Sequence, residues 1–145
     1  MKQEMVVNWM TKTPVTISQD ASLLKADEVL QKHDVRRLLV LDSNKRLTGI
    51  VTIGDIREGF PLDSASLTPA ELEDALAKIS VSHVMTPNPI TIFSDYTIAQ
   101  AANFMLENKV SGLPVVDING GLAGIITESD IFRLVVQHWT EEEER

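Results

Sequence analysis

The sequence predicts a mixed α/β (α+β) fold made of two copies of a β-α-β-β-α unit. The main observation is an internal repeat: after a shift of 75 residues, positions 6–57 align with 81–132 without a gap, and about 19 of the 52 positions are identical. The second observation is that short β-rich runs alternate with helical apolar patterns in each copy. The third is size, because 145 residues with 43% hydrophobic content can bury a core without disulfides or metals.

The second copy shows the order of elements most clearly. A β-rich run at 90–93 comes first, and Thr97 with Gln100 then fits a capping box that starts a helix. Apolar residues follow at helical spacing, namely Ile98, Ala101, Ala102, Met105 and Leu106. The continuous apolar run 113–116 is typical of a strand buried on both faces, 117–121 is a turn, and 122–126 is the return strand. The closing helix is expected from Asp130 to Gln137.

The first copy repeats this pattern, and a helical connector joins the two. We expect copy one at 6–60, a connecting helical segment at 61–80, copy two at 81–138 and an acidic tail at 139–145. In the connector, Thr68, Pro69 and Glu71 provide an N-cap, a proline at the first helical position and an acidic partner. The four glutamates at 141–144 predict a solvated, frayed end.

Composition excludes several classes of function. The net charge of −8 disfavours nonspecific binding to nucleic acid or to anionic membranes, and no apolar run approaches the length of a membrane span. The absence of cysteine excludes disulfides, thiolate metal sites and cysteine nucleophiles. The amino terminus does not read as a signal peptide, so a cytoplasmic location is expected. We expect no catalytic residues, because the histidines are isolated and no nucleophile or phosphate-loop motif occurs, and no metal site.

The candidate chemistry lies where each return strand enters a helix. Thr52 precedes Asp55 by three residues, and Thr127 precedes Asp130 in the same way. A capping box that needs no ligand explains this spacing. A binding site explains it too, because the start of a helix can receive a phosphate and a carboxylate can accept hydrogen bonds from the diol of a ribose.

These motifs resemble a known family. Each copy closely resembles the CBS domain. The motifs that carry the resemblance are M-T-x-x-P, then a helix, then V-S-G-L-P-V-V-D and finally L-x-G-I-I-T-x-x-D-I. The spacing and the connector are similar to CBS-pair proteins of the acetoin-utilisation type, without the further carboxyl-terminal domain that members of that type often carry.

The resemblance implies a Bateman module, in which two CBS domains pack with pseudo-twofold symmetry and leave two clefts for adenosine-containing ligands. These ligands are AMP, ADP, ATP, S-adenosylmethionine or NAD, none of them an obligatory cofactor. The resemblance implies one cleft made of Thr52, Asp55, Thr86, Ile90, Val110 and Ser111. It implies a second cleft made of Thr127, Asp130, Thr11, Val15, Val35 and Arg36, with Arg37 alongside.

The first copy departs from the family pattern and makes the two clefts unequal. Arg36 and Arg37 stand where the second copy has Ser111 and Gly112. An arginine beside the ligand's phosphates can clamp their oxygens, whereas two surface arginines at a helix-to-strand corner are the alternative. The cleft with Thr127, Asp130 and Arg36 is therefore expected to prefer phosphorylated ligands.

The resemblance favours a nucleotide-sensing module that signals to an unidentified partner protein. Two other hypotheses remain. One is a purely structural dimerisation module with vestigial clefts, and the other is an enzyme or nucleic-acid binder. A homodimer is also expected, through the apolar faces of the closing helices at 56–60 and 131–136. Burial inside the monomer is the competing explanation for those apolar residues.

Overall fold

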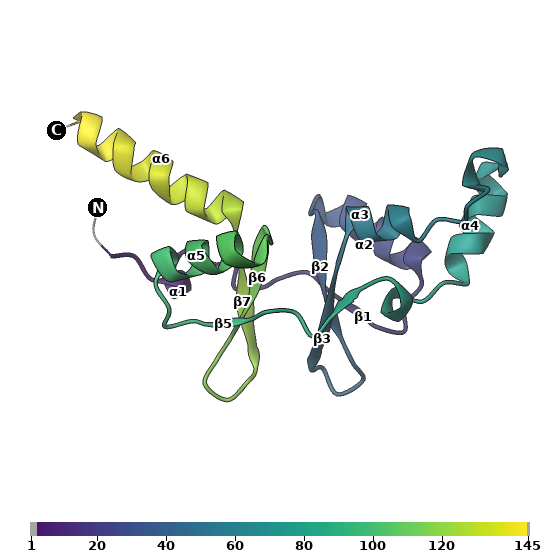
Figure 1. Ribbon diagram of the computed structural model, residues 1–145, viewed down its shortest axis with the longest axis horizontal. Coiled ribbons are helices and arrows are strands. Elements are labelled where there is room, and N and C mark those ends of the chain that lie inside the picture. Colours follow the sequence, from purple (N-terminus) through teal and green to yellow (C-terminus); the bar gives the residue numbers. More distant parts are fainter. Residues whose placement is uncertain (1–2, 145) are drawn as a thin grey trace. The chain divides into compact units, whose positions relative to one another are not determined.

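The computed structural model describes residues 3–144 and divides the chain into two compact units (Figure 1). The central unit comprises residues 15–89. Its elements are β1 (Thr16–Ser18), α2 (Leu23–His33), β2 (Arg37–Leu41), β3 (Leu47–Thr52), α3 (Ile53–Glu58), α4 (Pro69–Ala77) and β4 (Thr86–Pro87), with two 3-10 turns, η1 (Ser64–Ser66) and η2 (Val81–His83). Its sheet has the order β1-β2-β3-β4, with β1 parallel to β2 and the other pairs antiparallel.

The carboxyl-terminal unit comprises the described residues of 1–14 and 90–145. It contains α1 (Val6–Trp9), β5 (Ile92–Phe93), α5 (Ile98–Asn108), β6 (Gly112–Val116), β7 (Leu122–Thr127) and α6 (Glu128–Glu144). The sheet order is β5-β6-β7, and β5 is parallel to β6 as β1 is to β2. Each copy thus has the β-α-β-β-α order, and the predicted α/β fold class is confirmed.

The two copies match in fine detail as well. The capping boxes at Thr97 and Thr68 are present as predicted. Helices α2 and α5 both end on a residue in the left-handed region, Asp34 with φ 51° and Lys109 with φ 55°, which lie 75 positions apart. Such residues cap a helix by turning the chain out of it. Equivalent local conformations therefore support the duplication beyond residue identity.

An exchange of segments joins the two copies. Thr11, near the start of copy one, bridges Ile125 of β7 through backbone hydrogen bonds of 2.9 and 3.0 Å in both directions. Thr86, near the start of copy two, pairs with Ile50 of β3 as part of β4. Each Met-Thr segment therefore completes the sheet formed by the other copy.

Each unit has its own apolar core. In the central unit the buried residues come from β1, α2, β2, β3, α3, α4 and η2. In the carboxyl-terminal unit, buried residues of α5, β6 and β7 pack with Val6 and Leu134. Leu134 was expected on an exposed dimer face, but it is 2% exposed because the inner face of α6 covers this core.

The acidic end of the chain corrects the expectation of a frayed tail. Helix α6 continues without a break from Glu128 to Glu144, as Figure 1 shows. Gln137 donates to Glu141 at 3.2 Å, and the Thr140 hydroxyl donates to the carbonyl of Val136 at 2.8 Å. Glutamate has a high helix propensity, and a helix already anchored by its core face extends at little cost. Arg145, the last residue of the expected tail, lies outside the described residues.

Two glycines allow the exchanged segments to approach closely. A Cβ on Gly124 would overlap the carbonyl oxygen of Thr11 and lie 3.0 Å from the sulfur of Met10. A Cβ on Gly49 would overlap the Met85 side chain and lie 3.0 Å from the carbonyl oxygen of Thr86. The obstruction is thus backbone at Gly124 but chiefly a flexible side chain at Gly49.

We predict that Gly124→Ala lowers the free energy of unfolding by about 1–3 kcal/mol, because the exchanged strand must shift to admit the methyl group. Gly49→Ala should cost less, since the Met85 side chain can move. Gly54→Ala is the control: its Cβ would lie 3.6 Å from the nearest atom, and it should stabilise α3 by about 0.5–1 kcal/mol. Urea denaturation followed by circular dichroism checks all three. Equal stability of Gly124→Ala and the parent chain would contradict the close approach.

Candidate functional site

The Thr52–Asp55 pair forms a complete capping box at the start of α3. The Thr52 hydroxyl accepts from the backbone N–H of Asp55 at 3.1 Å, and Asp55 Oδ2 accepts from the backbone N–H of Thr52 at 2.9 Å. Both residues are half-buried. The capping interpretation of the sequence is therefore confirmed here, and this pair needs no ligand to satisfy these groups.

The Thr127–Asp130 pair has a different set of contacts. Asp130 Oδ2 accepts from the backbone N–H of Thr127 at 2.8 Å and from its hydroxyl at 3.2 Å. Asp130 Oδ1 accepts from the guanidinium of Arg133 one turn later. Asp130 is 2% exposed, whereas the side chain of Arg133 is 64% exposed. A buried carboxylate is thus held by its own strand end and by a solvent-facing cation.

The exchanged segments bring each Met-Thr motif to one of these pairs. Thr11 bridges Ile125, two residues before Thr127, so it lies in the same unit as Thr127 and Asp130. Thr86 pairs with Ile50, two residues before Thr52, and lies in the same unit as Asp55. Both threonines are exposed. A strand end, a carboxylate and a solvent-facing Met-Thr segment therefore occur together twice.

The other predicted site residues fall into both units. The central unit contains Val15, Val35, Arg36 and Arg37, and the carboxyl-terminal unit contains Ile90, Val110 and Ser111. Arg36 is exposed between the end of α2 and the start of β2, as expected for a helix-to-strand corner. Each predicted cleft combines residues of both units, and this combination remains a prediction.

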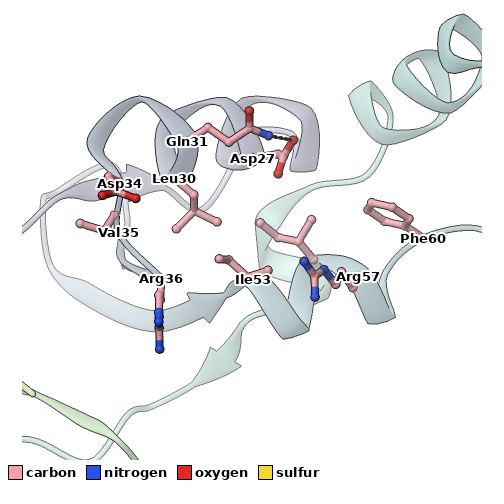
Figure 2. Close-up of a pocket in the computed structure, with 10 residues that line it drawn as sticks. Asp27, Leu30, Gln31, Asp34, Val35, Arg36, Ile53, Arg57 and Phe60 are labelled. Carbon is pink, nitrogen blue, oxygen red and sulfur yellow. Dashed lines mark hydrogen bonds between the residues drawn. The ribbon is translucent and has the colours of Figure 1, made fainter. Parts of the chain in front are cut away.

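A hollow of about 490 Å³ lies in the central unit beside α2 and α3 (Figure 2). Its apolar lining consists of Leu30, Val35, Ile53, Ile56 and Phe60. Its charged and polar lining consists of Asp27, Gln31 and Asp34 from α2 and its end, with Arg36 and Arg57. Gln31 donates to Asp27 at 2.9 Å, as the dashed line in Figure 2 shows.

Of these residues, only Val35 and Arg36 were predicted to contact a ligand, and the segment 56–60 was predicted to form part of a dimer face. The polar residues of α2 were missed, because charged residues on an amphipathic helix usually indicate a solvated face. The spacing of Asp27, Gln31 and Asp34 at i, i+4 and i+7 was the available signal, since it places them on one side of α2.

Residues 3–144 contain neither a metal-binding cluster nor a membrane-spanning helix. No group of three or more His, Cys, Asp or Glu side chains in this part of the chain could hold a metal ion. No helix in the same range is long and apolar enough to cross a membrane.

Comparison with curated proteins identifies close relatives. The family model of the CBS domain matches residues 5–61 and 81–137. A CBS domain-containing protein of Dictyostelium discoideum is 37% identical over 136 residues, which cover 92% of each chain. The L-aspartate semialdehyde sulfurtransferase of Methanocaldococcus jannaschii is 31% identical over 130 residues, but the chain spans only 23% of that enzyme.

Solved structures with the same fold contain adenosine compounds. The CBS-domain pair of protein MJ0100, in complex with 5′-methylthioadenosine and S-adenosyl-L-methionine, is similar with a TM-score of 0.78 at 29% identity, covering 94% of this chain and 99% of that one. CBSX2 of Arabidopsis thaliana in complex with AMP is similar with a TM-score of 0.75 at 31% identity, covering 92% and 97%.

A third structure bears on the type of CBS pair. A protein assigned to acetoin utilization (AcuB) from Vibrio cholerae has a TM-score of 0.75 at 26% identity, covering 99% of this chain and 98% of that one. The family model matches both copies, and the fold of the pair matches as well. The chain belongs to the CBS-domain family, as a tandem pair of the Bateman-module type.

Proposed function

We propose that this protein is a regulatory module that binds an adenosine-containing ligand and transmits its presence to a partner protein. The observation that carries the proposal is the double occurrence of a Thr–Asp pair beside an exchanged Met-Thr segment. The complexes of CBSX2 with AMP and of the MJ0100 pair with S-adenosylmethionine support this class of ligand. We place the protein in the cytoplasm, where such nucleotides are abundant, in a regulatory and not a catalytic role.

The start of α6 supports a phosphate or ribose contact. This helix is 17 residues long, and its first turn contains the buried Asp130. A long helix presents a partial positive charge and unpaired N–H groups at its amino terminus. A ribose hydroxyl could replace the guanidinium of Arg133 on Asp130 Oδ1, because the Arg133 side chain is largely exposed and can turn toward solvent or phosphate.

We further propose that the two clefts differ in preference. The cleft with Thr127, Asp130 and Arg36 would favour phosphorylated ligands, since Arg36 supplies a guanidinium for two-pronged contact with phosphate oxygens. Its counterpart with Thr52, Asp55 and Ser111 has less positive charge and would stay empty or take a neutral nucleoside end. The exposed position of Arg36 is consistent with this role.

We predict that Asp130→Ala and Arg36→Ala weaken the same single site for AMP or ATP by about tenfold or more, because a hydrogen bond to a charged group contributes about 1.5–3 kcal/mol. Asp55→Ala should leave that site nearly intact. Isothermal titration calorimetry of each variant measures these affinities.

Two controls make that experiment decisive. Arg46→Ala removes an exposed arginine from the turn between β2 and β3 and should not change binding. Asp130→Asn keeps the volume of the buried side chain, so a melting curve alongside separates lost binding from lost folding. If Asp55→Ala abolishes binding while Arg36→Ala has no effect, the preferred cleft is wrongly assigned.

A structural module with vestigial clefts is the second candidate. The observation that favours it is the closed capping box at Thr52 and Asp55, whose groups satisfy one another. A thermal-shift panel of AMP, ADP, ATP, S-adenosylmethionine and NAD separates the two candidates. A ligand at 100 times its dissociation constant stabilises the folded state by about 2.7 kcal/mol, so the absence of any shift would favour the structural module.

We also propose a homodimer, formed through the hollow of the central unit. Its apolar lining is flanked by Asp27 and Asp34 from α2 and by Arg57 from α3. A twofold axis brings the same patch of two copies together, so acidic α2 residues of one copy can meet Arg57 of the other. The expected contribution of 56–60 is thus retained, whereas Leu134 is removed from the face by burial.

We predict that the parent chain elutes with twice its mass of 16.1 kDa in size-exclusion chromatography with light scattering. Arg57→Asp should shift the chain toward the monomer, because it places like charges across the twofold axis. The double variant Asp27→Arg with Arg57→Asp should restore the dimer. Arg46→Asp is the matched charge reversal outside the hollow. A monomeric parent chain at micromolar concentration would exclude the dimer.

A further inference from the structure

Residues 4–11 cross the carboxyl-terminal unit as a strap that ends at the candidate site. Val6, inside the strap, is fully buried in the apolar core of this unit. Thr11, at its end, exchanges two backbone hydrogen bonds with Ile125, two residues before the end of β7. The position of the strap therefore decides where Thr11 lies beside the Thr–Asp pair at the start of α6.

A polar clamp ties the start of this strap to α6. The two carboxylate oxygens of Glu4 have different partners: Oε2 accepts from the indole N–H of Trp9 at 3.1 Å, and Oε1 lies 3.1 Å from Nε2 of His138. The side chains of Glu4 and His138 are 27% and 17% exposed, so most of the clamp is shielded from water. We call Glu4, Trp9 and His138 the clamp. Because hydrogen bonds depend on direction as well as distance, the clamp fixes the strap at one position against α6.

Helix α6 connects the clamp to the candidate site. Asp130 lies in the first turn of the helix, and His138 follows eight residues later, a helical rise of about 12 Å. The strap is thus held twice, by Thr11 on the strand that leads into α6 and by Glu4 on His138. A shift of the strap along the helix would break the clamp and move Thr11 relative to Asp130.

The corresponding strap of the central unit, residues 79–86, has apolar side chains at the clamp positions. The same backbone contact anchors both straps, since the carbonyls of Glu4 and Ile79 each accept at 2.8 Å from the first residue of a helix, α5 or α2. At the repeat distance of 75 residues, Ile79 replaces Glu4 and Val84 replaces Trp9, and both pack on the apolar core of the central unit. Backbone contacts and apolar packing thus attach a strap, and the clamp adds direction to this attachment.

We propose that the clamp positions Thr11 against the Thr127–Asp130 pair and so prepares this one of the two sites for its ligand. Glu4 is the positioning residue, because both partners act through its carboxylate. Without the clamp, Val6 and the backbone would still attach the strap, but Thr11 would move more freely, and ordering it would reduce the affinity for a ligand. The ligand part of this inference rests on the proposed function, whereas the positioning of Thr11 does not.

The first test measures amide hydrogen exchange by NMR in the full chain without ligand. His138→Leu keeps a side chain of similar size but removes the nitrogen that faces Glu4. Exchange at the amides of Thr11 and Ile125 should become faster by about tenfold, since a hydrogen bond to a charged group contributes at least that factor. His138→Gln retains an N–H donor and should restore the parent rates. Gln137→Leu is the matched control, because this exposed neighbour bonds within α6.

The amides of β6 report the stability of the whole unit in the same spectra. They should exchange at the parent rates in every variant, because β6 lies in the core and not on the strap. Unchanged exchange at Thr11 in His138→Leu would overturn the proposal. Acceleration at β6 equal to that at Thr11 would overturn it too, since the clamp would then stabilise the unit as a whole.

Calorimetric titration with AMP provides the ligand arm. His138→Leu should weaken binding by about three- to tenfold, and so should Trp9→Phe, which removes the indole N–H but keeps an aromatic ring. The double variant should lose less than the product of the two, because both changes act on one carboxylate. Unchanged AMP affinity together with faster exchange at Thr11 would overturn the positioning role. If the parent chain binds no AMP, the proposed function fails, while the exchange measurement still decides on the clamp.

Discussion

The pairing of each Met-Thr segment with the return strand of the other copy is the contact on which this structure depends. Thr11 exchanges two backbone hydrogen bonds with Ile125, and Thr86 continues the sheet beside Ile50. Neither compact unit is therefore made of one copy alone. Gly124 allows this close approach, because a Cβ there would overlap the backbone of the arriving segment, whereas at Gly49 it would chiefly overlap the flexible Met85 side chain. Each copy thus places its Met-Thr segment in the sheet of the other copy, and this exchange couples the two copies.

The contacts of the two Thr–Asp pairs separate a simple helix cap from a candidate site. A cap needs a hydroxyl and a carboxylate at the start of a helix, and Thr52 with Asp55 meets that need completely. Asp130 does more, because its second oxygen is held by Arg133, whose side chain faces solvent. A buried carboxylate that depends on an exposed cation is well placed to exchange that cation for another donor. The pair at α6 is therefore the better candidate for the proposed ligand contact.

The sequence was sufficient for the order of elements, the duplication and the capping boxes, because these follow from local spacing of apolar and polar residues. It was insufficient where the outcome depends on contacts distant in the chain. Glu4 and His138 lie 134 residues apart in the chain, and no sequence periodicity indicates their contact. The helical end at 141–144 was missed because a run of glutamates reads as a solvated tail, although α6 is anchored by Leu134. Of the hollow, the sequence indicated Val35, Arg36 and the segment 56–60, but not the polar residues of α2.

The closing helices of the two copies differ in length and in what they bury. At the repeat distance of 75 residues, Gly59 corresponds to Leu134 and Arg57 to Phe132. Gly59 ends α3, and a Cβ there would lie 2.8 Å from Val84 and 2.9 Å from Leu23, so a larger residue could not follow the same path. In the second copy Leu134 instead fills the core and the helix continues to Glu144. One ancestral surface has thus become a short helix beside a mixed-charge hollow in the first copy. In the second it has become a long helix on which Phe132, Val136 and Trp139 are exposed.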